Sequence, residues 1–126
     1  MEGDPKMKQR RRQVALQRII QRIKKDVPTA DVVVTNPTHF AVALQYDSKA
    51  MHAPRVVAKG QDLIAMRIRE IAVANGVPIL ERKPLARALY KMCNVGQEIP
   101  EEFYSTVAEI LAYVYELSGK MKKRAS

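Results

Sequence analysis

The chain centres on Val32-Val33-Val34-Thr35-Asn36-Pro37-Thr38-His39, which joins an apolar run to a turn. Three consecutive valines are typical of a strand, because β-branched side chains pack well on a pleated surface. A continuously apolar strand is typical of an inner position in a sheet that is covered on both faces. Asn-Pro marks a turn, since the proline ring presets φ for the second turn position. We therefore expect an inner strand at 31–35 that leads into a turn at Asn36-Pro37.

The bond between Asn36 and Pro37 has a particular covalent chemistry. An asparagine in a loop usually decays when the next backbone nitrogen attacks its side-chain amide, but Pro37 has no N–H for this reaction. In the remaining route, the side-chain nitrogen of Asn36 attacks its own backbone carbonyl, closes a succinimide and releases Pro37 as a new N-terminus. A turn that holds these atoms in near-attack geometry can supply roughly 7–11 kcal/mol of the barrier. His39 is a candidate proton carrier for the departing amine, because histidine exchanges protons near neutral pH.

The segments after the turn predict further strands. A strand with one bulky face is expected for Phe40, Val42, Leu44 and Tyr46, which alternate with alanines. This strand either forms a hairpin with the first one or is directed elsewhere by the tight corner. Strands are also expected at 56–59 and 77–80, with a helix at about 62–75 between them. A strand, a helix and a strand at this spacing are typical of a right-handed parallel crossover.

Apolar residues at helical spacing predict four helices. The side chains expected to face inward are Leu16, Ile19, Ile20, Ile23 and Val27 in a helix at 6–27; Leu63, Ile64, Ile68, Ile71 and Ala72 in the helix at 62–75; Leu85, Leu89 and Met92 in a short helix that begins at Pro84; and Phe103, Val107, Ile110, Leu111, Val114 and Leu117 in a last helix between Pro100 and Gly119. The expected fold is α+β: a small mixed sheet of about four strands, packed by about four helices, with a basic N-terminal linker helix.

The net charge of +9 lies at the two ends of the chain. Residues 1–25 hold nine Lys/Arg against two acidic residues, and residues 120–126 hold four more, whereas 26–119 is close to neutral. We therefore divide the chain into a basic juxtamembrane linker helix at 1–27, a globular domain at 28–119 and a basic flexible tail. This placement favours a linker near an anionic membrane surface over a nucleic-acid binder, whose basic residues usually lie on the folded surface.

This chain lacks the residues that several other functional classes require. The hydrophobic content of 47% suits one core, and no apolar run reaches the length of about 18 residues that spans a membrane. Cys93 is the single cysteine, so no internal disulfide forms, and we expect it to pack as a small hydrophobe. One cysteine and two histidines are too few for a structural zinc site, and five scattered glycines form no phosphate loop. We expect neither a metal nor a cofactor.

The residues around the turn resemble the FlhB/YscU family, the substrate-specificity switch proteins of bacterial type III export systems. The resemblance is carried by Asn36-Pro37-Thr38-His39 and continues through 53–60, 67–71, 77–79 and 84–90. Residues 43–47 and 56–60 look more like the flagellar branch than the injectisome branch. Because Asn-Pro alone usually means a simple turn, this context is what makes the motif specific.

The resemblance implies that the globular domain cleaves itself once between Asn36 and Pro37, with Thr38 and His39 shaping the turn and managing protons. The domain is then no turnover enzyme, because the nucleophile is consumed. The implied partners are an export-gate membrane protein, the secreted hook-length control protein and export substrates, with no nucleic acid. The implied location is the cytoplasmic face of the bacterial inner membrane, to which a membrane domain outside this chain attaches it.

Apolar residues in an expected surface loop suggest a second site. Ala53 and Pro54 either fold over the last helix or, as the resemblance allows, form a shallow docking patch for export substrates with Ala108 and Leu111. His52, in the same loop, is expected to be an ordinary surface histidine. The alternative to a self-cleaving switch is a non-cleaving interaction module of an export apparatus, in which the Asn-Pro turn is purely structural.

Overall fold

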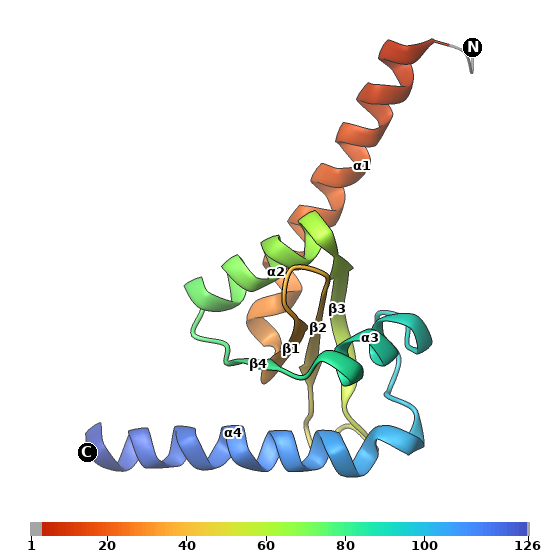
Figure 1. Ribbon diagram of the computed structural model, residues 1–126. Coiled ribbons are helices and arrows are strands. Elements are labelled where there is room, and N and C mark those ends of the chain that lie inside the picture. Colours follow the sequence, from red (N-terminus) through yellow and green to blue (C-terminus); the bar gives the residue numbers. More distant parts are fainter. Residues whose placement is uncertain (1–3, 126) are drawn as a thin grey trace.

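The computed structural model describes residues 4–125, and their side chains as far as Gly119. The elements in chain order are α1 (Pro5–Asp26), the 3-10 turn η1 (Val27–Thr29), β1 (Val32–Asn36), β2 (Phe40–Gln45), β3 (Arg55–Gln61), α2 (Asp62–Ala74), β4 (Ile79–Glu81), α3 (Lys83–Met92), the 3-10 turn η2 (Glu101–Phe103) and α4 (Tyr104–Ala125). One end of α1 points away from the sheet, and α4 crosses the opposite end of the molecule (Figure 1). The α+β class, with four strands and four α-helices among the described residues, is confirmed.

The four strands form one mixed sheet in the order β3-β2-β1-β4. β1 and β2 are an antiparallel hairpin in which Asn36 pairs with Phe40, so the hairpin alternative is confirmed. β1 lies inside the sheet, because its other edge pairs in parallel with β4. The β3–α2–β4 unit does join parallel strands, but these strands lie at opposite edges of the sheet rather than side by side.

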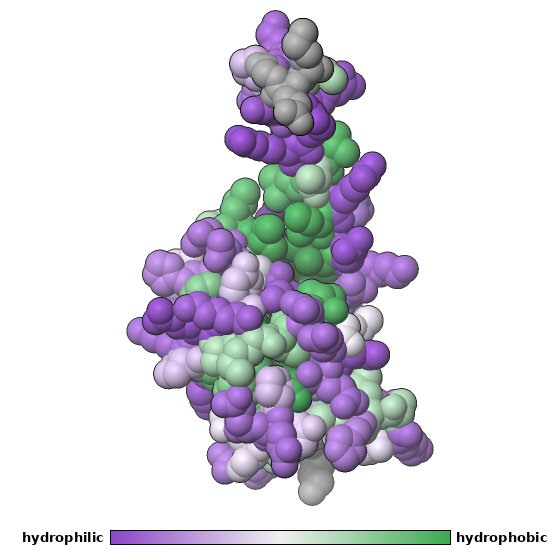
Figure 2. Space-filling view, turned by 90° about the vertical axis from the view of Figure 1, so that its right-hand side faces the viewer, coloured by the Kyte–Doolittle hydropathy of each residue, from purple (hydrophilic) through white to green (hydrophobic). Residues whose placement is uncertain are grey.

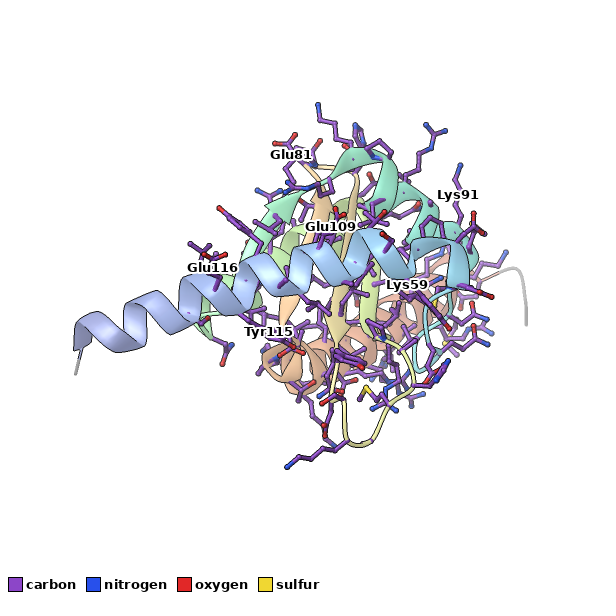
Figure 3. The ribbon with its side chains drawn as sticks, turned by 90° about the horizontal axis from the view of Figure 1, so that it is seen from below. Lys59, Glu81, Lys91, Glu109, Tyr115 and Glu116 are labelled. Carbon is purple, nitrogen blue, oxygen red and sulfur yellow. The ribbon has the colours of Figure 1, made fainter. Side chains whose placement is uncertain are left out.

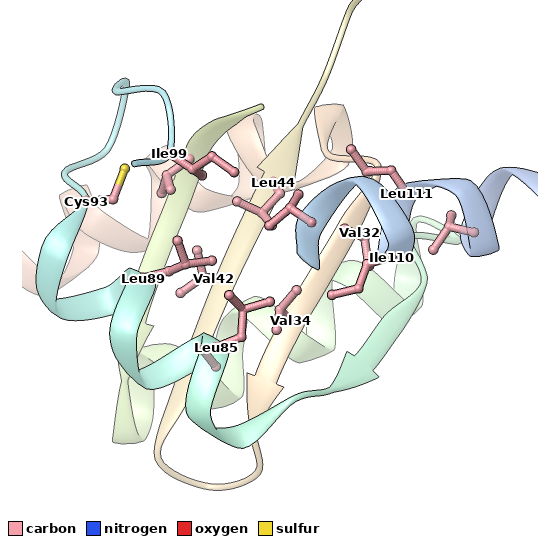
Figure 4. Packing of buried hydrophobic residues seen from close by; sticks show 14 residues of the cluster. Val32, Val34, Val42, Leu44, Leu85, Leu89, Cys93, Ile99, Ile110 and Leu111 are labelled. Atoms are coloured by element: carbon pink, nitrogen blue, oxygen red, sulfur yellow. The ribbon is translucent and has the colours of Figure 1, made fainter. Parts of the chain in front are cut away.

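Each face of the sheet has its own core. One face presents the fully buried Val32, Val34, Val42, Leu44 and Val56 to side chains of α3 and α4, including Leu85, Leu89, Ile110 and Leu111 (Figure 4). The other face presents Val33, Ala41, Ala43 and Ala58 to α2 and to Ile23 and Val27. The alternation follows from the strand period of two. Small alanines on the second face let α2 approach the sheet closely.

Gly60 shows how close this approach is. It lies in β3, opposite Ala41, and a Cβ added to it would clash with Cγ2 of Ile64 in α2. Real Cβ atoms do not come this close, so only glycine allows the first turn of α2 to fold back on the strand. The strand itself runs from Arg55 to Gln61, past both ends of the predicted 56–59.

Four helical residues predicted to face inward are exposed. Ile19, Leu63, Met92 and Leu117 have 40%, 54%, 53% and 42% of their surface accessible. Ala65 and Cys93 are buried in the same helical regions instead, at 1% exposure each. The periodicity identified the correct face in each helix, but it extended the stripe beyond the surface that the sheet can cover.

Two predicted boundaries are also wrong. Gly119 does not stop the last helix, because α4 continues to Ala125 past the edge of the sheet (Figure 1). Glycine inside a helix costs only about 1 kcal/mol relative to alanine, which a long helix tolerates. The fourth strand, Ile79–Glu81, begins two residues later than predicted, because the backbone N–H of Val77 still donates to the carbonyl of Ala72 in α2. The predicted flexibility of 120–126 stays a prediction.

Little of α1 belongs to the core. Its N-terminus is capped by Asp4, whose carboxylate accepts a hydrogen bond from the backbone N–H of Lys6 at 3.0 Å. Of its predicted apolar stripe, Ile23 is buried, Leu16 and Ile20 are half-buried and Ile19 is 40% exposed. Apolar side chains gather just below the projecting part of α1 (Figure 2). Over residues 4–125, no helix combines the length and the apolar character that crossing a bilayer requires.

Candidate functional site

The connection between β1 and β2 is a β-turn made by Asn36, Pro37, Thr38 and His39. The backbone N–H of His39 donates a hydrogen bond of 3.0 Å to the carbonyl oxygen of Asn36. Thr38 has a φ of +68°. Positive φ at the third position, after a proline at the second, is the signature of a type II turn. The four predicted motif residues therefore form one closed turn.

Thr38 is strained in this conformation. The third position of a type II turn usually holds glycine or asparagine, because a side chain branched at Cβ crowds the backbone at positive φ. Such a conformation costs roughly 1–3 kcal/mol, and it persists only where surrounding contacts impose it. The strained residue therefore lies one position beyond the Asn36-Pro37 bond.

Contacts on both sides of the turn impose the conformation. The backbone N–H of Arg82 donates to the carbonyl of Thr35 at 2.9 Å and ties the end of β1 to the start of α3. The backbone N–H of Asp62 donates to the carbonyl of His39 at 2.9 Å and ties the end of the turn to the start of α2. Asp62 itself has a φ of +53°. The turn is therefore held between the first residues of two helices that pack on opposite faces of the sheet.

The side chains of the turn are available for chemistry. Asn36 is half-buried, and no described residue forms a hydrogen bond with its amide. The imidazole of His39 is exposed and also has no hydrogen-bond partner within residues 4–125. The amide nitrogen of Asn36 is therefore not held by a competing acceptor, and the carbonyl that it would attack already receives a hydrogen bond from a backbone N–H.

The structure adds three cationic side chains to this site that the sequence reading missed. Asn36 lines a shallow groove of about 440 Å³ together with Lys83, Arg87 and Lys91 of α3. The three cations are separated by four residues and therefore lie on one face of the helix. Their spacing was visible in the sequence, but their position beside Asn36 depends on how α3 packs.

The four residues of the predicted docking patch come together in a second groove. Ala53, Pro54, Ala108 and Leu111 line a groove of about 340 Å³ between α4 and the loop that follows β2. Ala53 and Leu111 are 2% and 4% exposed and form its floor, whereas Ala108 is exposed at its rim. The lining is completed by Tyr46, His52, Tyr104, Ala112 and Tyr115. The three tyrosines were not predicted, since they come from segments about 60 residues apart.

Tyrosines give this groove its polar edge. The ring of His52 meets that of Tyr104 edge-on, with 6.2 Å between centroids. Burial raises the pKa of the Tyr115 hydroxyl above its usual value, and the charges of Asp31, Tyr46 and Asp47 raise it further. The hydroxyl therefore stays protonated and can donate a hydrogen bond to a ligand in the groove.

The turn and the docking groove lie at opposite ends of the hairpin. The turn is closed by the paired residues Asn36 and Phe40. Tyr46 lies at the other end of the hairpin, just beyond the paired residues Val32 and Leu44. Four residues of strand separate these pairs, or about 14 Å. Tyr115 and Glu81, which pairs with Thr35 at the turn end, lie on opposite sides of α4 (Figure 3). The two sites share the hairpin as their common scaffold.

Comparison with known proteins gives the family. The model of the FlhB HrpN YscU SpaS family matches residues 1–114. A flagellar biosynthetic protein FlhB from Escherichia coli is 56% identical over 116 residues, which cover 92% of this chain and 30% of that protein. The corresponding Bacillus subtilis protein is 51% identical over 124 residues, which cover 95% of this chain and 33% of that protein. The chain thus spans about a third of the length of these relatives.

The fold agrees with that assignment. The crystal structure of the cytoplasmic domain of FlhB from Shewanella putrefaciens matches with a TM-score of 0.78 and 45% identity, over 83% of this chain and 81% of that chain. The flagellar relatives also bear out the branch that the sequence favoured. The family model matches most of this chain, and most of the chain also aligns with the flagellar relatives and with the solved structure. This chain therefore belongs to the FlhB HrpN YscU SpaS family of the export apparatus.

Proposed function

We propose that this domain cleaves itself once between Asn36 and Pro37 and thereby controls which substrates a flagellar type III export apparatus accepts. The observation that carries the proposal is the hydrogen bond of 3.0 Å from the backbone N–H of His39 to the Asn36 carbonyl oxygen. This carbonyl belongs to the bond that would break. The donor is therefore placed where negative charge develops, which is the geometry of an oxyanion hole.

The reaction proceeds without a cofactor. Nδ2 of Asn36 attacks the Asn36 carbonyl carbon and loses a proton, and the N–H of His39 stabilises the oxyanion. The bond from this carbon to the Pro37 nitrogen then breaks, and that nitrogen takes up a proton as it leaves. Water opens the succinimide at the former backbone carbonyl and leaves an α-carboxylate on Asn36. Strain at Thr38 contributes to the driving force, because cutting the chain frees its backbone.

The docking groove is the proposed surface for export substrates. Its floor of small and apolar side chains, edged by tyrosine hydroxyls, suits a short apolar segment with a few polar groups. In the whole protein, the domain would face the cytoplasm at the bacterial inner membrane. There it would meet the export-gate membrane protein, the hook-length control protein and the substrates themselves.

Intact mass under denaturing conditions tests the cleavage. The purified chain should give two species that correspond to residues 1–36 and 37–126, and Asn36→Ala should give one uncut chain. Asn94→Ala, which changes an exposed asparagine outside the turn, should cleave normally. Pro37→Ala should cleave slowly and accumulate an aspartate product, because it restores the N–H that proline lacks. A single uncut species for the parent chain would instead support the non-cleaving interaction module.

A separate experiment tests the docking groove. Ala108→Glu places a charge at the exposed rim of the apolar groove, so it should weaken the binding of export-substrate segments without changing cleavage. Thr106→Glu, on the exposed face of the same helix outside the groove, is the matched control. Equal binding by both variants would place the substrate surface elsewhere.

A further inference from the structure

The groove beside Asn36 is cationic. Its lining consists of Asn36, Lys83, Pro84, Arg87, Ala88 and Lys91, which include three cations and no acidic side chain. Lys83 also meets Glu81 at 3.6 Å, but both side chains are more than half exposed, and a pair of this kind contributes little. Arg87 and Lys91 form no ion pair with any residue whose side chain is described. The intact chain therefore supplies almost no negative charge to this groove.

The position of these cations relative to Asn36 is fixed by the core. On the opposite face of α3, Leu85, Ala86 and Leu89 are buried against the sheet. At the start of the helix, the backbone N–H of Arg82 donates to the carbonyl of Thr35, the residue before Asn36. The cationic face of α3 thus stays beside the end of β1 whether or not the chain continues beyond Asn36.

Cleavage changes the charge at this point. The bond between Asn36 and Pro37 is a neutral amide, and its hydrolysis product is a carboxylate on Asn36 together with an ammonium on Pro37. The carboxylate would be attracted to the three cations, and the new ammonium would be repelled by them. The same cluster therefore acts in opposite directions on the two new chain ends.

We propose that Lys83, Arg87 and Lys91 form a binding site for the α-carboxylate that cleavage creates on Asn36. The site rests on the proposed self-cleavage, because the carboxylate does not exist before it. It retains the end of β1 in the sheet and leaves the Pro37-Thr38-His39 segment free to move away. Cleavage then remodels one side of the turn only, and the surface that changes is the one formed by residues 37–39.

NMR titration of the cleaved protein tests the site. The carboxyl carbon of Asn36, labelled with 13C, should titrate with a pKa below the range of about 3.3–3.7 that is usual for a C-terminal carboxyl. Arg87→Gln should raise this pKa and Arg87→Lys should largely preserve it, because charge rather than shape is required. Added salt should move the parent value toward the usual range, since the groups are solvent-accessible. Arg69→Gln, which alters a cation of α2 outside the groove, is the control.

A second readout is the rate at which the fragment 1–36 leaves the cleaved protein in moderate urea. Removing two exposed charge partners with Lys83→Gln and Arg87→Gln together should accelerate this loss by about threefold to tenfold. A cleaved chain whose Asn36 carboxyl titrates in the usual range and does not respond to Arg87→Gln would overturn the carboxylate site alone. A chain that remains a single mass species would overturn self-cleavage and, with it, the site.

Discussion

The backbone N–H of His39 lies 3.0 Å from the carbonyl oxygen of Asn36, so the residue that closes the turn also polarises the bond that we propose to break. Because this donor belongs to the backbone, side-chain substitution at His39 leaves it in place. The contributions of the His39 backbone and the His39 imidazole can therefore be separated.

His39→Ala tests the imidazole. If the imidazole carries protons, this variant should cleave about 10²–10⁴ times more slowly. The hairpin should persist, because the N–H that bonds Asn36 remains. Single-turnover rates from intact mass across pH give the measurement, with His52→Ala, at another exposed histidine, as the control. An unchanged rate at every pH would mean that the imidazole has no role in cleavage.

Thr38→Gly tests the role of backbone strain. Glycine adopts a φ of +68° without strain, so the intact turn should lose the cost of roughly 1–3 kcal/mol that threonine imposes. Cleavage should slow by about 5- to 150-fold if this strain is released in the transition state.

The uncleavable Asn36→Ala background separates stability from rate. In that background, Thr38→Gly should raise the free energy of unfolding in urea, although the greater freedom of glycine in the unfolded chain offsets part of the gain. Ser48→Gly, at a loop residue without positive φ, should not raise it. A faster cleavage in Thr38→Gly would mean that the threonine conformation opposes the reaction.

The two cleavage products should remain together. The shorter one ends in β1, whose Val32, Val33 and Val34 are fully buried between β2 and β4. Burying each valine contributes roughly 1.5–3 kcal/mol. Dissociation would expose the valines, leave β4 without a partner strand and leave one edge of β2 unpaired. We expect one particle on native gel filtration, and we expect residues 37–126 not to refold cooperatively after the short piece is removed in denaturant. Independent refolding of the long piece would contradict the inner-strand role of β1.

The buried thiol of Cys93 should make the fold sensitive to alkali. Burial raises its pKa above the usual 9.0, and the charge of Lys59 opposes this only in part. Between 9.0 and the raised value, the unfolded chain has lost the thiol proton while the folded chain keeps it. The free energy of unfolding should therefore fall as pH rises through this window. Urea unfolding measured below and above that window should show a smaller fall in the free energy of unfolding for Cys93→Ala than for the parent chain. An equal fall in the two proteins would assign the sensitivity to other groups.

The sequence by itself determined the inner strand and its turn. Val32-Val33-Val34 can only be buried on both faces, and Pro37 cannot continue the strand, so local chemistry was sufficient. The alternation of bulky residues and alanines in β2 likewise assigned its two faces correctly, because the strand period is geometric.

The tertiary structure alone decided which residues meet. Lys83, Arg87 and Lys91 lie beside Asn36 only because β4 pairs with β1, and α3 begins directly after β4. Leu63, Met92 and Leu117 continue apolar stripes yet are exposed, since burial depends on the extent of the opposing surface and not on periodicity. The positive φ of Thr38 depends on the contacts that Asp62 and Arg82 make with the two ends of the turn. These contacts are long-range, and no local pattern in the chain encodes them.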